Sequence, residues 1–160
     1  MRTEPAPVTN IVLAGLGGQG VLKASDIVAG AAFAAGLDVK KSELHGMSQR
    51  GGSVTSDVRF GPCVLSPMVP PAEADYLVIL APDQVENNRW QLRRGGTLLT
   101  PGLIEERQLR SKKSLNVALL GVLSTRLDIP ESAWLDALRA NLPEKLHEVN
   151  LQAFALGRSL

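Results

Sequence analysis

Residues 10–36 read NIVLAGLGGQGVLKASDIVAGAAFAAG, and they set the architecture of the domain. The apolar run at 10–14 stops at a glycine, which is typical of a buried parallel strand. Residues 21–36 are rich in alanine, carry their polar side chains early and finish at Gly36, a residue suited to closing a helix. A strand, a glycine-rich turn and a helix in this order predict the first half of a βαβ unit.

Further strands and helices alternate along the chain. The pattern predicts strands at 37–43, 53–60, 74–81 and 97–100, and helices at 84–94, 116–127, 132–141 and 143–157. Gly95 and Gly96 would stop the first of these helices, and Ser132 would cap the third. A short run after Gly61 and Pro62, CVLS, predicts a β-hairpin excursion.

We therefore expect an α/β fold, namely a Rossmann-like, mostly parallel sheet with helices on both faces and a β-hairpin excursion, in a single domain. Residues 1–9, which hold two prolines, would be a flexible lead-in to a domain at 10–160.

The composition narrows the class of protein. The formal net charge of the 160 residues is +1, and no concentrated basic stripe is present, which argues against a nucleic-acid binder. A single cysteine, Cys63, excludes an internal disulfide and favours a reducing, cytoplasmic setting. Because Cys63 stands in an apolar run, we expect a half-buried, unreactive thiol. No apolar run approaches the ~20 residues that span a bilayer.

The glycine-rich turn, residues 15–20, has the spacing of a nucleotide-binding fingerprint. Gly15, Gly17 and Gly20 satisfy G-x-G-x-x-G where a strand meets a helix, and Glu43 ends the next strand, where an acidic residue could bind a ribose. A dinucleotide site is one interpretation. The other is that the glycines only allow a tight turn and close packing. A P-loop is excluded because Val21 and Leu22 stand where lysine and serine or threonine are needed.

A second motif, ELHGMSQRGGSV at 43–54, concentrates polar residues and glycines. Arg50 would clamp a phosphate or carboxylate, with His45 beside it, or the segment would be a turn that hydrogen-bonds itself. Ser48 lacks the second glycine of a nucleophile elbow. The only histidines, His45 and His147, lie far apart without ligand spacing, so we expect no metal site.

Five segments together resemble one known family. They are GLGGQGVLKASDIVAGAA, ELHGMSQRGGSVTSDVRFG, SPMVPPAEADYLVIL, NVALLGVL and EVNLQAFALG, which cover nearly the whole chain. The chain resembles the gamma-type subunit or domain of the 2-oxoacid:ferredoxin oxidoreductases, and within them the beta subunit of the indolepyruvate type. It departs from the family at APDQVENN, residues 81–88, and in a short connection at 99–115.

The resemblance implies a pyruvate/ketoisovalerate oxidoreductase gamma-type domain that is not active alone. Such enzymes decarboxylate a 2-oxoacid on thiamine diphosphate, pass electrons through iron-sulfur clusters to ferredoxin and release an acyl-CoA. Thiamine diphosphate, magnesium and the clusters are expected on a larger partner subunit. This chain has one cysteine and no GDG…N signature, in agreement with that division. Neither nucleic acid nor a membrane is an expected partner.

The expected site residues follow from the two motifs. No catalytic residue is expected within the chain, and His45, Gln49 and Arg50 would complete a thiamine or CoA pocket at the subunit interface. The candidates for cofactor contact are Gly15, Gly17, Gly18, Gln19, Gly20, Gly46, Ser48, Gly51 and Gly52. For the glycine-rich turn, a structural or interface role is favoured over nucleotide binding. The alternative functions are a self-sufficient small dinucleotide-binding Rossmann protein and a partner-binding scaffold without activity.

Overall fold

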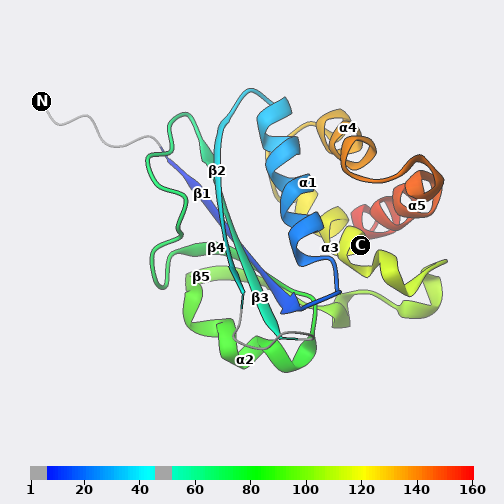
Figure 1. Cartoon of the computed structure of the whole chain (residues 1–160), viewed down its shortest axis with the longest axis horizontal. Coiled ribbons are helices and arrows are strands. Elements are labelled where there is room, and N and C mark those ends of the chain that lie inside the picture. Colours follow the sequence, from blue (N-terminus) through cyan, green and yellow to red (C-terminus); the bar gives the residue numbers. More distant parts are fainter. Residues whose placement is uncertain (1–6, 46–51) are drawn as a thin grey trace, which may run out of the picture.

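The glycine-rich turn lies at one end of a five-stranded sheet with the strand order β2-β3-β1-β4-β5 (Figure 1). The computed structural model describes residues 7–45 and 52–160. The strands are β1 (Thr9–Leu16), β2 (Asp38–His45), β3 (Ser53–Gly61), β4 (Ala74–Ile79) and β5 (Leu92–Leu99). The helices are α1 (Val21–Ala34), α2 (Val85–Asn88), α3 (Leu115–Ser124), α4 (Glu131–Asn141) and α5 (His147–Arg158).

The sheet is mixed, so the expectation of a mostly parallel sheet is only partly right. β1 pairs in parallel with β4, and β4 with β5, whereas β3 is antiparallel to both β1 and β2. Few residues separate β2 from β3, so these two strands form the hairpin. The hairpin expected after Gly61 was wrong, because CVLS forms no strand.

Helices cover both faces of the sheet, but very unequally. Alternate residues of β1, Ile11 and Leu13, belong to the main core with α1, α3, α4 and α5. Val12 and Ala14 point the other way, into a small core that receives Val85 from the one-turn helix α2. Period-two alternation along β1 thus divides the interior into a large and a small core. We call the second side the α2 face.

A long connection, residues 62–73, covers part of the α2 face. Arg59 donates from Nη1 to the Ser66 carbonyl at 2.7 Å, and the Val69 amide donates to Asp57 Oδ2 at 2.9 Å. Near its start, the Val64 amide donates to Asp38 Oδ2 at 2.7 Å. The polar residues that alternate along β3 therefore hold the connection, which explains why the strand predicted to have one wet face is polar on that side.

The expected helix at 84–94 was wrong beyond its first turn. α2 ends at Asn88, a 3₁₀ turn follows, and β5 starts at Leu92 and runs through both glycines. A Cβ at Gly96 would lie 2.6 Å from Leu92 Cδ1 and 3.0 Å from the Ala74 carbonyl. The β4–β5 register shifts at this point. The glycine pair therefore accommodates an irregular strand rather than stopping a helix.

The helical ends were predicted with mixed success. The amide of Gly36 donates to the Phe33 carbonyl, and the amide of Leu37 donates to the Ala32 carbonyl. This is the Schellman arrangement, and it ends α1 at Gly36 as expected. The expected cap at Ser132 was wrong, because α4 starts at Glu131 and Pro130 occupies the cap position.

Candidate functional site

The glycine-rich turn is closed by its own glutamine. The Leu16 amide donates to Gln19 Oε1 at 2.7 Å, and the Gln19 amide donates to the Leu16 carbonyl at 3.2 Å. A Cβ at Gly15 would lie 2.8 Å from Gln19 Oε1 and 3.1 Å from Leu80 Cβ. Gly15 thus makes room for the closing side chain and for the residue after β4, so part of the motif serves packing.

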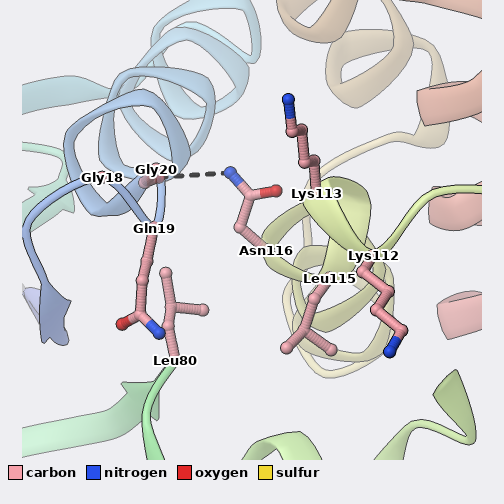
Figure 2. Close-up of a pocket in the computed structure, with 8 residues that line it drawn as sticks. All are labelled: Gly18, Gln19, Gly20, Leu80, Lys112, Lys113, Leu115 and Asn116. Atoms are coloured by element: carbon pink, nitrogen blue, oxygen red, sulfur yellow. Dashed lines mark hydrogen bonds between the residues drawn. The ribbon is translucent and has the colours of Figure 1, made fainter.

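Gly20 joins the starts of two helices. It is the cap residue of α1, in the left-handed region at φ 82°, and its carbonyl accepts a hydrogen bond from Asn116 Nδ2 at 3.2 Å (Figure 2). Asn116 is buried in the first turn of α3, and its Oδ1 accepts from the Val117 amide at 2.9 Å. This amide side chain holds the two helix N-termini side by side.

A cavity of about 470 Å³ opens between these helix starts, and we call it the glycine-turn pocket. Its lining consists of Gly18, Gln19, Gly20, Leu80, Lys112, Lys113, Leu115 and Asn116 (Figure 2). The two lysines are exposed and come from the 3₁₀ turn that leads into α3. Gly20, the cap residue of α1, lines the pocket, and among the described residues the first turn of α1 has no acidic side chain and no side-chain cap.

This arrangement suits an anionic group. Helix N-termini attract anions through free amides and the helix dipole, and lysine adds a mobile positive charge. Lys112 makes one long ion pair, 3.7 Å from Nζ to Glu106 Oε2, between exposed side chains, which is worth little. The pocket therefore presents positive potential to a phosphate or carboxylate.

Sequence reasoning missed Lys112, Lys113 and Asn116 as site residues. The lysines lie outside both motifs, and Asn116 entered only as the first residue of a predicted helix. Their position along the chain could have identified them, because they stand just before, or in the first turn of, a helix that follows a parallel strand. Such helices start at the edge of the sheet where the glycine-rich turn lies.

The second motif reaches the glycine-rich turn through its last glycine. The Gly17 amide donates to the Gly52 carbonyl at 2.9 Å, just beyond the final β1–β3 pair, Leu16 with Ser53. This contact places Gly17 and Gly52, both predicted site residues, together. Except for His45, the other predicted residues of this motif lie outside the described residues, namely Gly46, Ser48, Gln49, Arg50 and Gly51.

His45 and Glu43 do not line the glycine-turn pocket. Both border a second cavity, of about 600 Å³, at the α2 face. Because β3 lies between β1 and β2, Glu43 is two strands away from β1, or about 10 Å. In a dinucleotide-binding Rossmann fold the acidic strand is the direct neighbour of the first strand. The inserted antiparallel strand therefore removes the ribose-binding role considered for Glu43.

Glu43 takes part in an ion cluster with Lys41 instead. Lys41 Nζ lies 2.8 Å from Glu43 Oε1 and 3.4 Å from Ser25 Oγ, and it also pairs with Asp26 of α1. Burial acts to lower the pKa of Lys41, but the hydrogen bonds and charges of Asp26 and Glu43 outweigh burial and raise this pKa above its ordinary value. The cluster fastens β2 to α1.

Several other expectations concern single features of the chain. Cys63 is exposed, which corrects the half-buried position expected for it. His147 is half-buried and its Nε2 donates to the Leu142 carbonyl at 2.7 Å and to the Arg139 carbonyl at 3.1 Å, so it caps the end of α4. Within 7–45 and 52–160, no helix has both the length and the apolar character needed to cross a membrane.

The sequence of this chain is similar to those of known oxidoreductase subunits. Residues 10–103 match the model of the family described as pyruvate ferredoxin/flavodoxin oxidoreductase. Indolepyruvate oxidoreductase subunit IorB of Thermococcus kodakarensis is 34% identical over 190 aligned positions, which cover 92% of this chain and 93% of that protein. The subunit of the same name from Archaeoglobus fulgidus is 40% identical over 135 positions, covering 84% of this chain and 54% of that protein.

The fold also occurs in solved structures of other oxidoreductases. The gamma subunit of a keto/oxoacid ferredoxin oxidoreductase from Geobacter sulfurreducens superposes with a TM-score of 0.80 at 23% identity, covering 94% of this chain and 96% of that chain. The 2-oxoglutarate:ferredoxin oxidoreductase from Magnetococcus marinus, solved with 2-oxoglutarate, coenzyme A and succinyl-CoA, gives 0.83 at 23% identity, covering 98% of this chain but only 31% of that longer chain. The chain therefore belongs to the pyruvate ferredoxin/flavodoxin oxidoreductase family.

Proposed function

We propose that this chain is the subunit without redox or thiamine cofactors in an indolepyruvate-type 2-oxoacid:ferredoxin oxidoreductase. The observation that carries the proposal is the likeness to the Thermococcus subunit, which extends over more than nine-tenths of both chains. One cysteine cannot provide the four thiolates of an iron-sulfur cluster. The clusters, thiamine diphosphate and magnesium would therefore reside on a larger, cytoplasmic partner that passes electrons to ferredoxin.

Within the complex, the glycine-turn pocket would bind an anionic part of coenzyme A. The lysines beside Gly18 and Gly20, together with a start of α1 that no described side chain caps, support a ligand role over the purely structural one favoured from sequence. The Magnetococcus relative was solved with coenzyme A bound. Phosphate groups match this pocket because they accept several hydrogen bonds and carry the opposite charge.

The second motif would complete the same site from the side of Gly52. Its composition supports this role, since Arg50 can bind a phosphate or carboxylate in a bidentate manner and Gln49 and His45 can hydrogen-bond. The Gly17–Gly52 contact gives the motif a fixed starting point beside the glycine-rich turn. Residues 46–51 would then lie between this chain and the catalytic subunit.

The subunit assignment is tested by purifying the chain from its host under non-denaturing conditions. A larger protein carrying iron-sulfur clusters and thiamine diphosphate, with 2-oxoacid-dependent reduction of ferredoxin, is the expected result. A chain that purifies alone with a bound nucleotide would overturn the assignment in favour of a small dinucleotide-binding protein, and one with neither partner nor nucleotide would favour a scaffold.

The role of Arg50 is tested in the reconstituted complex. Arg50→Ala should raise the KM for coenzyme A or weaken subunit association, because a bidentate charged contact is lost. Arg107→Ala is the matched control, since Arg107 is an exposed arginine that pairs only with Glu105 in the described part of the chain. Unchanged assembly, KM and turnover in Arg50→Ala would remove Arg50 from the site.

A further inference from the structure

The second cavity is a built pocket on the α2 face, and we call it the acidic pocket. Its floor is formed by Thr55 and Asp57 of β3 with Ser42 of β2, and one wall by residues of the α2 segment. It encloses about 600 Å³ and has no lysine or arginine among its described lining residues. Asp57 supplies its acidic side chain, because Glu43 only borders the pocket and its carboxylate pairs with Lys41 beside α1. The pocket is therefore opposite in charge to the glycine-turn pocket.

Three large apolar side chains that line the pocket are exposed to solvent. Leu44 is 71% exposed, Met68 63% and Trp90 61%, and they come from β2, the 62–73 connection and the turn after α2. Trp90 Nε1 donates to the Asn87 carbonyl at 3.0 Å, which fixes the ring although most of it faces solvent. Exposed aromatic and methionine side chains gathered around one cavity are typical of a protein interface.

Asp57 carries a half-buried carboxylate in this pocket. One oxygen, Oδ2, accepts the Val69 amide, and burial raises the pKa of this carboxyl despite that hydrogen bond and the charge of Arg59. Arg59 is directed elsewhere, to Asn10 Oδ1 at 2.7 Å and to the Ser66 carbonyl at 2.7 Å. The pocket thus holds a partly desolvated carboxylate to which no cation of the described lining is paired.

Gln84 adds a second unmet requirement. The residue is only 8% exposed, and its Oε1 has no hydrogen-bond partner among the described residues. Its backbone is satisfied, since its amide donates to Ala81 at 2.9 Å and its carbonyl accepts from Asn88 Nδ2 at 2.8 Å. A buried acceptor without a donor is rare in folded proteins, and this one belongs to a residue that lines the pocket, with the oxygen itself shielded from solvent.

From these observations we infer that the acidic pocket receives an arginine side chain of the larger subunit. A guanidinium carries five N–H donors, which suit the Asp57 carboxylate, and its plane stacks on an exposed indole such as Trp90. Lysine offers a point charge and no plane to stack. A free cation would leave the exposed apolar side chains around the pocket uncovered. A polypeptide that presents an arginine would cover them as well, so we favour a protein partner.

The identity of the partner rests on the proposed function. The acidic pocket lies at the same end of the sheet as the glycine-turn pocket, in agreement with that function. The glycine-turn pocket is lined by the turn after β1, and the acidic pocket by the end of β2 and the start of β3. The Gly17–Gly52 hydrogen bond joins these regions. One partner surface that covers this end of the sheet would therefore contact both pockets.

The test measures association of the purified chain with the larger subunit. Asp57→Asn, which keeps an acceptor for the Val69 amide, and Trp90→Ala should each weaken association about tenfold, the size expected for a hydrogen bond to a charged group or a buried anchor. Asp136→Asn and Phe33→Ala are matched controls, because they remove an exposed carboxylate of α4 and an exposed aromatic of α1. These controls should associate like the unaltered chain.

A gain-of-charge variant separates binding from folding. Asn87→Lys places a cation in the pocket without removing any of the side-chain hydrogen bonds described there, so it should fold normally yet weaken association, whereas Asn87→Gln should not. Nuclear magnetic resonance of the chain alone provides an independent measurement. A short peptide with a central arginine should shift the Asp57 carboxyl and Trp90 indole signals, and the same peptide with neutral citrulline should not.

Each outcome decides the inference. Normal association of Asp57→Asn, Trp90→Ala and Asn87→Lys overturns it even if the complex is an active oxidoreductase. Equal responses to arginine and citrulline peptides overturn the assignment of a guanidinium. A third outcome would also overturn the inference. If the arginine peptide has no effect, but the Asp57 and Trp90 signals of Arg50→Ala differ from those of the unaltered chain, the pocket binds an arginine of this chain and not one of the larger subunit. If no larger subunit binds the unaltered chain, the proposed function fails and the peptide titration alone decides the chemistry of the pocket.

Discussion

The Gly17 amide donates to the Gly52 carbonyl at 2.9 Å, so the two glycine-rich motifs of this chain meet at one end of the sheet. The contact continues the antiparallel pairing of β1 with β3 by one further bond. It explains how segments distant in the sequence contribute to one region. Antiparallel β3, which a doubly wound fold would not place beside β1, makes the contact possible.

Gly20 should tolerate alanine less well than Gly18. Both have a positive φ, so alanine costs about 1–2 kcal/mol at either position. A Cβ at Gly20 would also lie 2.5 Å from Asn116 Nδ2, whereas one at Gly18 meets nothing within 4 Å. Gly20→Ala should therefore lose about 1 kcal/mol more of unfolding free energy, from the displaced Asn116 hydrogen bond. Urea unfolding measures both, and equal losses would contradict the role of Asn116.

Gly157 and Gly121 should not accept alanine. A Cβ at Gly157 would lie 1.9 Å from the Ala118 carbonyl, and one at Gly121 2.2 Å from the Phe154 carbonyl, because α3 and α5 touch through their backbones. Either alanine should lower the free energy of unfolding by about 3 kcal/mol or more. Gly30→Ala in α1 is the control, since its nearest neighbour is Ala137 Cβ at 3.3 Å. We expect Gly30→Ala to stay within about 1 kcal/mol of the unaltered chain.

Asp57 should make the chain less stable as the pH rises through the acidic range. Burial raises the folded-state pKa of this carboxyl above its ordinary value of 3.8, so the folded state binds its proton more tightly than the unfolded state. The resulting loss of unfolding free energy is absent below pH 3.8, grows as the pH rises towards the raised pKa and is complete above that pKa. Asp57→Asn should therefore gain stability relative to the unaltered chain over this interval. Urea unfolding across the interval checks this expectation, and a difference that does not change with pH would contradict it.

Lys112 and Lys113 should act on coenzyme A and not on the 2-oxoacid. Replacing both with alanine should raise the KM for coenzyme A about tenfold or more in the reconstituted complex, because two cations beside the glycine-rich turn are lost. The effect should shrink at high salt, since exposed charges are screened. Steady-state kinetics at two ionic strengths measures it, with Arg107→Ala as the control. An unchanged KM for coenzyme A would separate the pocket from this substrate.

The first βα unit was predictable because its signals are local. Residues 10–14 lie within β1, the helix starts at Val21 as expected, and Gly36 closes it. The helix predicted at 84–94 failed because its pattern is compatible with either structure. Parallel pairing of β5 with β4, in which Leu92 lies opposite Ala74 and Thr97 opposite Tyr76, decides in favour of a strand.

By itself, the sequence determined the glycine-rich turn, the absence of a cluster-binding set of cysteines and the family, because each depends on residue types at short spacing. Only the tertiary structure decided which residues share a site. It placed β3 between β1 and β2, which moved Glu43 away from the glycine-rich turn, and it brought Lys112, Lys113 and Asn116 to that turn. Strand order depends on long-range burial and pairing, which periodicity along one segment does not encode.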